Sequence, residues 1–168
     1  MLMIVRLMNE INEQSAFWLA NNFIWGWLLL PILALGELIK RNSAESPADI
    51  LRLLPSYVII SLVVMLVWLA TSPLWYPFLQ TILGIPHPEK VLYLVRLSFL
   101  FYVVFAFNNI IDSIFYGLGR TDLMLLQSLL VNVLLYGSAF ILYTMGFFHP
   151  SLDNITMLFG IGITVDAI

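Results

Sequence analysis

Cysteine is absent from this chain, and histidine occurs only twice, at His87 and His149. The absence of cysteine excludes a disulfide framework, thiol catalysis and cysteine metal sites. Each histidine lies beside a proline, and neither has a second histidine at the spacing of metal ligands. A nucleophile elbow, a glycine-rich phosphate loop and an HExxH motif are also missing. We therefore predict that the chain is not an enzyme and carries no organic cofactor and no resident metal.

Charge is scarce as well, because only 10% of the residues are charged while 61% are hydrophobic. Soluble domains contain about 25% charged and about 45–50% apolar residues. The mean hydropathy of +0.97 lies far from that range in the direction of integral membrane proteins. The net charge of −3 is weak, and no basic run indicates a nucleic-acid partner. The composition predicts a protein whose main partner is the lipid bilayer.

Long apolar runs divide the chain into membrane-spanning helices. A transmembrane helix needs about 20 mostly apolar residues. The runs that reach this length are four full spans, and two shorter runs at the ends are partial spans. The full spans are 16–39, 54–84, 91–118 and 123–148, and the partial spans are 1–8 and 154–168. The predicted fold is all-α, a polytopic transmembrane helix bundle, and we expect a longer protein to continue on both sides of it.

Lysine and arginine indicate the orientation of these spans. The connection after the first span carries Lys40, Arg41 and Arg52, and the connection after the third carries Arg120. The connections on the opposite side carry only Lys90. Because positive residues are enriched on the cytoplasmic side, the side of Lys40 and Arg120 is predicted to face the cytoplasm.

The third span contains a carboxylate, and ionisable residues inside a membrane are functional-site hypotheses by default. Five of its residues share one helical face at positions i, i+4, i+7, i+8 and i+11: Phe105, Asn109, Asp112, Ser113 and Tyr116. Asn108 lies four residues before Asp112, beside that face. Amide, hydroxyl and carboxylate oxygens suit a hard cation such as Na⁺ at Asp112, or a proton held by the carboxylate. The alternative is that these side chains only hold neighbouring helices together.

Two further spans carry polar or helix-breaking residues. In the fourth span, Asn132 shares a face with Ser128 and is expected to join the face of Asp112, or else only to bond between helices. In the first span, Pro31 frees a backbone carbonyl that a neighbour, water or an ion can use. Glu37 is predicted to pair with the cations one turn later, and Arg96, near the outer end of the third span, to anchor at the interface.

Three segments together resemble one family of transporters. Residues 20–31 (ANNFIWGWLLLP) and 35–40 (LGELIK) resemble the second helix of one half of a multidrug and toxic compound extrusion (MATE) transporter. Residues 109–132, with the turn FYGLGRTD at 115–122, resemble the fourth helix, glycine-rich turn and fifth helix. The family's usual turn is closer to RGxG(D/N)T, and Tyr116 stands where its first arginine would be. The resemblance extends over nearly the whole chain in order and spacing.

The resemblance implies a fold and an activity. Residues 1–168 would form most of one six-helix lobe, with the C-terminal lobe favoured by the polar cluster at Asn109 and Asp112. In some members a carboxylate in that region helps to bind the coupling cation, so the resemblance assigns cation or solute binding to Asp112, Asn109, Asn108, Asn132 and Tyr116. The implied activity is antiport: Na⁺ or H⁺ enters while a small organic solute leaves, as two lobes of the same longer chain rock around a central cavity. The implied location is the cell (plasma or inner) membrane.

Two alternatives belong to other classes of function. The same superfamily includes flippases for lipid-linked oligosaccharides, which line their cavity with several arginines or lysines. Only Arg96 could serve in that way here. A non-transporting membrane scaffold is the second alternative, in which Asp112 would be structural.

Overall fold

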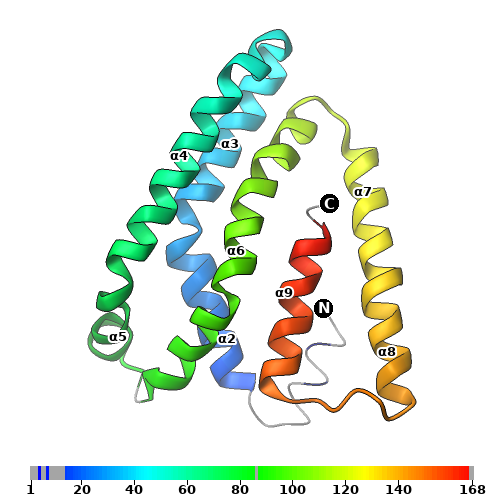
Figure 1. Cartoon of the computed structure of the whole chain (residues 1–168). Coiled ribbons are helices and arrows are strands. Elements are labelled where there is room, and N and C mark those ends of the chain that lie inside the picture. The colour runs from blue at the N-terminus through cyan, green and yellow to red at the C-terminus, as the bar shows by residue number, and fades with distance from the viewer. Residues whose placement is uncertain (1–3, 5–6, 8–13, 86, 167–168) are drawn as a thin grey trace.

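The structure is a computed structural model that describes residues 4, 7, 14–85 and 87–166. These residues form helices joined by short turns, and no strand occurs in the described ranges, which confirms the all-α prediction. The elements run α2 (Gln14–Phe23), η1 (Ile24–Leu28), α3 (Leu30–Glu45), η2 (Pro47–Asp49), α4 (Ile50–Thr71), η3 (Ser72–Leu74), α5 (Trp75–Pro77), η4 (Phe78–Ile82), α6 (Pro88–Gly117), α7 (Thr121–Leu130), η5 (Val131–Tyr136), α8 (Gly137–Thr144) and α9 (Leu152–Asp166). Figure 1 shows them as a bundle of long, roughly side-by-side helices.

Three continuous helical stretches are long and apolar enough to cross a membrane: Pro47–Ile82, Pro88–Gly117 and Thr121–Thr144. A fourth arises if Ser15–Leu28 and Leu30–Glu45, which meet at 53°, form one broken span. These segments correspond to the four runs predicted to be full spans. Helix α9 is shorter, at 15 residues, as expected for a partial span. The predicted partial span 1–8 lies outside the described residues except for Ile4 and Leu7, which are fully buried.

Helix α6 occupies the centre of the bundle. It packs against α2, α3, α4 and α9, and 44% of its most apolar 18-residue stretch is buried inside the bundle. The same measure is only 11% for the α7–α8 stretch, which stands at one side of the bundle (Figure 1). A cation or solute site that uses α6 can therefore be built within this chain, while the apolar surface of α7 faces outward.

Helices α3 and α6 approach each other closely at two glycines. A Cβ atom added at Gly36 would lie 2.7 Å from Nδ2 of Asn109 and 2.9 Å from Oγ of Ser113. One added at Gly117 would collide with the carbonyl oxygen of Lys40. Small residues permit such contact between helices in a membrane. We call this contact of Gly36 and Gly117 between the two helices the α3–α6 seam. It fixes the rotation of α6 and hence the direction in which the polar side chains of α6 point.

The first span is broken near its middle. A π-helical turn, Ile24–Leu28, precedes α3, and Pro31 lies in the first turn of α3. Trp68 of α4 donates a hydrogen bond from Nε1 to the carbonyl oxygen of Leu28 at 2.9 Å. Proline has no backbone N–H, so a helix continuing unbroken through residue 31 would lack one of its backbone hydrogen bonds. The interruption predicted at Pro31 is thus present, and a side chain from α4 satisfies one of the carbonyls at the break.

Candidate functional site

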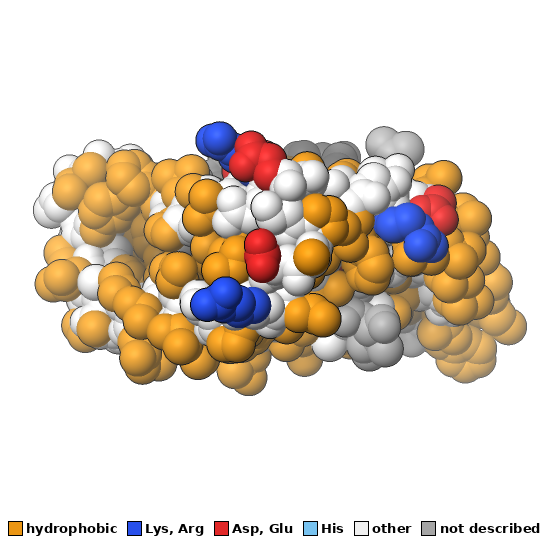
Figure 2. Space-filling model, turned by 90° about the horizontal axis from the view of Figure 1, so that it is seen from above, with side chains coloured by type: hydrophobic (Ala, Val, Ile, Leu, Met, Phe, Trp, Pro, Cys, Tyr) orange, Lys and Arg blue, Asp and Glu red, His pale blue; other side chains and the backbone are white. Residues whose placement is uncertain are grey.

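A cavity of about 270 Å³ lies between α6, α7 and the last turn of α9. Its lining combines two carboxylates, four other polar side chains and two apolar ones. The residues are Asp112, Tyr116, Thr121, Met124, Leu125, Gln127, Ser128 and Asp166. The cavity lies toward the end of the bundle that carries the α3–α4 and α6–α7 turns, where Lys, Arg, Asp and Glu side chains stand among hydrophobic ones (Figure 2). That end is the one predicted to face the cytoplasm.

Asp112 is half-buried and is held by its neighbour one turn earlier. Nδ2 of Asn108 donates to Oδ2 of Asp112 at 2.9 Å and also contacts the backbone oxygen of Asp166 at 3.5 Å. Asn108 itself is buried. A single amide therefore fixes one carboxylate oxygen of α6 and ties α6 to the end of α9. Asp112 presents its other oxygen without a hydrogen-bond donor from the described part of the chain.

Asp166 is a site residue that the sequence reasoning did not identify. It lies in the last turn of α9, and it lines the cavity together with Asp112. Two carboxylates at one partly enclosed cavity repel each other, and a cation or a shared proton relieves that repulsion. A signal was present, because Asp166 follows an apolar run and a carboxylate in such a run requires a partner. The run before it is shorter than a full span, so its pattern alone does not mark this carboxylate as intramembrane.

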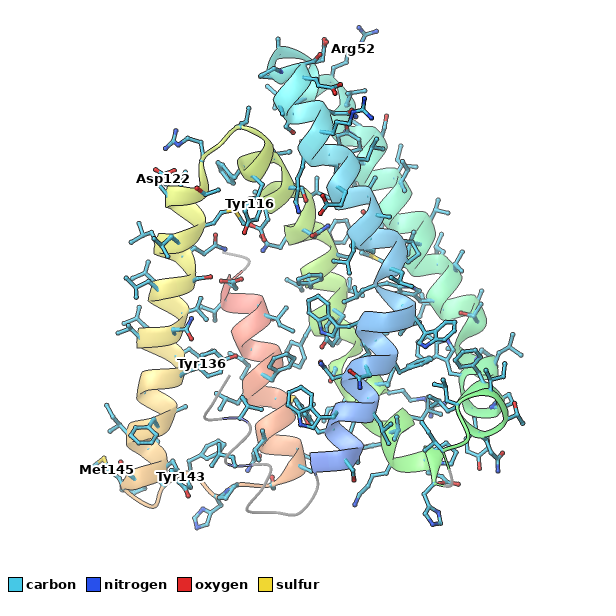
Figure 3. The ribbon with its side chains drawn as sticks, turned by 180° about the vertical axis from the view of Figure 1, so that it is seen from behind. Arg52, Tyr116, Asp122, Tyr136, Tyr143 and Met145 are labelled. Atoms are coloured by element: carbon cyan, nitrogen blue, oxygen red, sulfur yellow. The ribbon has the colours of Figure 1, made fainter. Side chains whose placement is uncertain are left out.

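Tyr116 stands beside the α6–α7 turn and lines the cavity (Figure 3). The Nζ atom of Lys40, on α3, lies 5.1 Å from the centroid of its ring. That ammonium group is also paired with Oε1 of Glu37 at 2.6 Å, which confirms the predicted pairing of Glu37 with a cation one turn later. Lys40 is consequently engaged by Glu37 and by the aromatic ring of Tyr116.

Asn109 does not line this cavity. Its Nδ2 donates to the carbonyl oxygen of Ile32 on α3 at 3.1 Å, within the α3–α6 seam. Ser113, one turn later, lies on the same seam. The single polar face expected on α6 is thus divided. Asn109 contacts α3, whereas Asp112 and Tyr116 line the cavity. For Asn109 the contact corresponds to the alternative interpretation, in which the amide holds two helices together.

Asn132 is also outside the cavity lining. It is exposed, and its Nδ2 donates to the carbonyl oxygen of Ser128 within its own helical stretch. Gln127 and Ser128, on the preceding turn of the same stretch, line the cavity instead. At the exposed α6–α7 turn, Nε of Arg120 donates to Oδ1 of Asp122 at 3.3 Å.

The cavity offers oxygen atoms of several kinds to a bound ion. Carboxylate, hydroxyl and amide oxygens are the ligands that hard cations take in proteins. Among the described residues, no group of three or more His, Cys, Asp or Glu side chains has the geometry to hold a metal ion. The arrangement suits a monovalent cation or a proton shared by Asp112 and Asp166, since one or two negative charges balance either of them.

The two neighbouring asparagines are expected to respond differently to substitution. Asn108→Ala removes the donor that orients Asp112, so we expect cation affinity at the cavity to fall about tenfold, the effect of one hydrogen bond to a charged group. Asn109→Ala removes only a bond across the α3–α6 seam, so thermal stability should fall while cation affinity is kept. Titration of the purified protein with NaCl at fixed ionic strength, followed by thermal unfolding, measures both quantities. Equal effects of the two substitutions on affinity would contradict this assignment.

Compared with protein-family models, with curated proteins and with solved structures, the chain matches no family model, no curated protein and no solved structure.

Proposed function

We propose that this protein is a cation-coupled secondary transporter that exports small organic solutes in exchange for Na⁺ or H⁺. One observation carries the proposal: Asp112, on a helix long and apolar enough to span a membrane, shares a cavity with Asp166. Carboxylates within membrane spans are costly, and they mark ion pathways and proton relays. A structural role alone would not require two of them at one cavity.

The coupling follows from the charge of the cavity. With both carboxylates ionised and no cation present, the cavity carries two negative charges inside the bundle. Binding of Na⁺ or H⁺ lowers that charge and favours a conformation in which the cavity is closed. An ion can shift a conformational equilibrium only through such a difference in affinity between two states. This difference is what links the ion gradient to movement of the solute.

The resemblance to MATE transporters supports the same proposal at a finer level. In that interpretation the chain is most of a C-terminal lobe, α6 is its fourth helix, and the cell membrane is its location. The solute passes between this lobe and a second lobe of the same longer chain, so the isolated chain of 168 residues is not expected to transport. The broken span and the glycine turn after α6 lie at the positions that carry the resemblance.

The proposal is tested by efflux from cells that express the intact protein. Cells loaded with a fluorescent organic cation, ethidium, are given an inward gradient of Na⁺ or of H⁺, and the loss of fluorescence is followed. We expect efflux to exceed that of cells without the protein severalfold, and to stop when the one coupling gradient is collapsed. Efflux that is unaffected by collapse of both gradients would contradict ion coupling.

A further inference from the structure

The break in the first span leaves more backbone acceptors than donors. Leu29 N–H donates to the carbonyl of Ile24, and Leu33 N–H donates to the carbonyl of Leu29. Four carbonyls, those of residues 25–28, lie between the carbonyls of Ile24 and Leu29. The carbonyl of Leu28 accepts a hydrogen bond from the indole of Trp68. The carbonyls of residues 25–27 then have only two backbone donors within reach, at residues 30 and 32, because Pro31 has no N–H.

With two donors for three acceptors, at least one of these carbonyls has no backbone N–H of its own. In the described part of the chain, no side chain donates a hydrogen bond to any of the three. The break lies near the middle of the bent pair Ser15–Leu28 and Leu30–Glu45, which together are long and apolar enough to cross a membrane as one span. An unsatisfied backbone group in the hydrocarbon core costs several kcal/mol, so a donor from outside the described chain would be strongly favoured there.

A groove of about 350 Å³ adjoins the break, on the surface between η1, α3 and α4. Its walls are apolar or aromatic, and they include Trp27, Pro31, Val63, Val67 and Trp68. Trp27 is 52% exposed, so its indole is available to a ligand. The hydroxyl of Thr71 also lines the groove, but it already donates to the carbonyl oxygen of Val67 at 2.7 Å. The groove thus combines room for an apolar body with a nearby backbone acceptor.

The charge of the groove identifies the kind of head group. No acidic or basic side chain is among the residues that line it. Neither a cationic nor an anionic head group would find a counter-charge in that place. A neutral hydroxyl can donate one hydrogen bond without burying a charge. We propose that this groove binds a neutral, membrane-soluble amphiphile whose hydroxyl group donates to the unpartnered carbonyl at the break.

This site is separate from the carboxylate cavity. The cavity is lined from α6, α7 and α9 and the groove from η1, α3 and α4, with no residue in common. Binding at the groove can be measured without an ion gradient, so its outcome does not depend on the proposed transport.

The test uses a matched pair of probes on the full chain in lipid nanodiscs. The first probe is 12-bromo-1-dodecanol, which donates a hydrogen bond, and the second is its methyl ether, which does not. Bromine quenches indole fluorescence on contact, so saturable quenching reports binding beside a tryptophan, and Trp27 and Trp68 line the groove. We expect the alcohol to bind about tenfold more tightly than the ether, the effect of one hydrogen bond in an apolar site.

Substitution of Pro31 identifies the acceptor. Pro31→Ala restores a backbone N–H at the break, so the preference for the alcohol should vanish while the ether still binds. Pro77→Ala, at the end of α5 and outside the groove, is the control and should keep the preference. Equal binding of the two probes to the unsubstituted chain would overturn the proposal, as would a preference that persists in Pro31→Ala. Loss of both probes in Pro31→Ala would also overturn it, since the apolar walls from α4 are unchanged.

Discussion

Replacing Asp112 with asparagine is expected to reduce ion-driven efflux by about 100-fold while the protein still folds and reaches the membrane. Asparagine has nearly the same shape, so Asn108 can still donate to its side-chain oxygen. What is lost is the negative charge, and with it the ability to take up a proton or to balance Na⁺. Contacts between charged groups and their ligands contribute up to about 3 kcal/mol, and about 2.7 kcal/mol corresponds to a 100-fold change.

The measurement compares efflux of ethidium from cells that express matched amounts of each variant. Asp122→Asn is the control, because Asp122 is also a carboxylate but lies exposed at the α6–α7 turn, beside Arg120. It should leave efflux within about twofold of the unsubstituted protein, as surface ion pairs contribute little. Normal efflux in Asp112→Asn would remove the coupling role and leave Asp112 with a structural one.

The course of the helices was predictable because it follows from apolar runs and helix-breaking residues. Each long run between turn residues became one helical stretch, and Pro31 indicated where the first one breaks. These features are local, since a bilayer requires a nearly uniform apolar length whatever the neighbouring helices are. The π-helical turn before Pro31 was not predicted, and the indole that bonds its last carbonyl belongs to Trp68, forty residues from Leu28 along the chain.

Which residues form the site was less predictable, because this depends on how α6 is rotated relative to the helices around it. Asn109 and Asp112 are three residues apart, and that spacing separates their directions by about 60°. This angle is small enough for one face in a sequence pattern, yet it sends Asn109 to α3 and Asp112 to the cavity. Gly36 and Gly117 determine this rotation, because their close contacts set which side of α6 lies against α3.

The same seam predicts a large effect on stability. In Gly117→Ala, the added Cβ would collide with the carbonyl oxygen of Lys40 and lie 2.5 Å from Cβ of Ser43. The first of these atoms belongs to the backbone of α3, so a side-chain rotation cannot relieve the contact and the two helices must separate. Overpacking of this kind lowers the free energy of unfolding by about 1–3 kcal/mol. We expect a lower thermal midpoint in detergent, measured by the loss of the monodisperse peak in size-exclusion chromatography after heating.

Gly137→Ala provides the matched control for this prediction. Gly137, the first residue of α8, likewise lies in a helical stretch long and apolar enough to cross a membrane, but a Cβ there would have its nearest contact at 3.9 Å, an ordinary van der Waals distance. Without a collision, alanine should raise stability by about 0.5–1 kcal/mol through its higher helix propensity. Opposite signs for the two substitutions would locate the effect in the α3–α6 seam, and an equal or higher midpoint for Gly117→Ala would show that α3 and α6 do not pack so closely. Because Tyr116 and Lys40 flank Gly117, separation of the helices should also weaken cation binding at Asp112, which Gly137→Ala should leave unchanged.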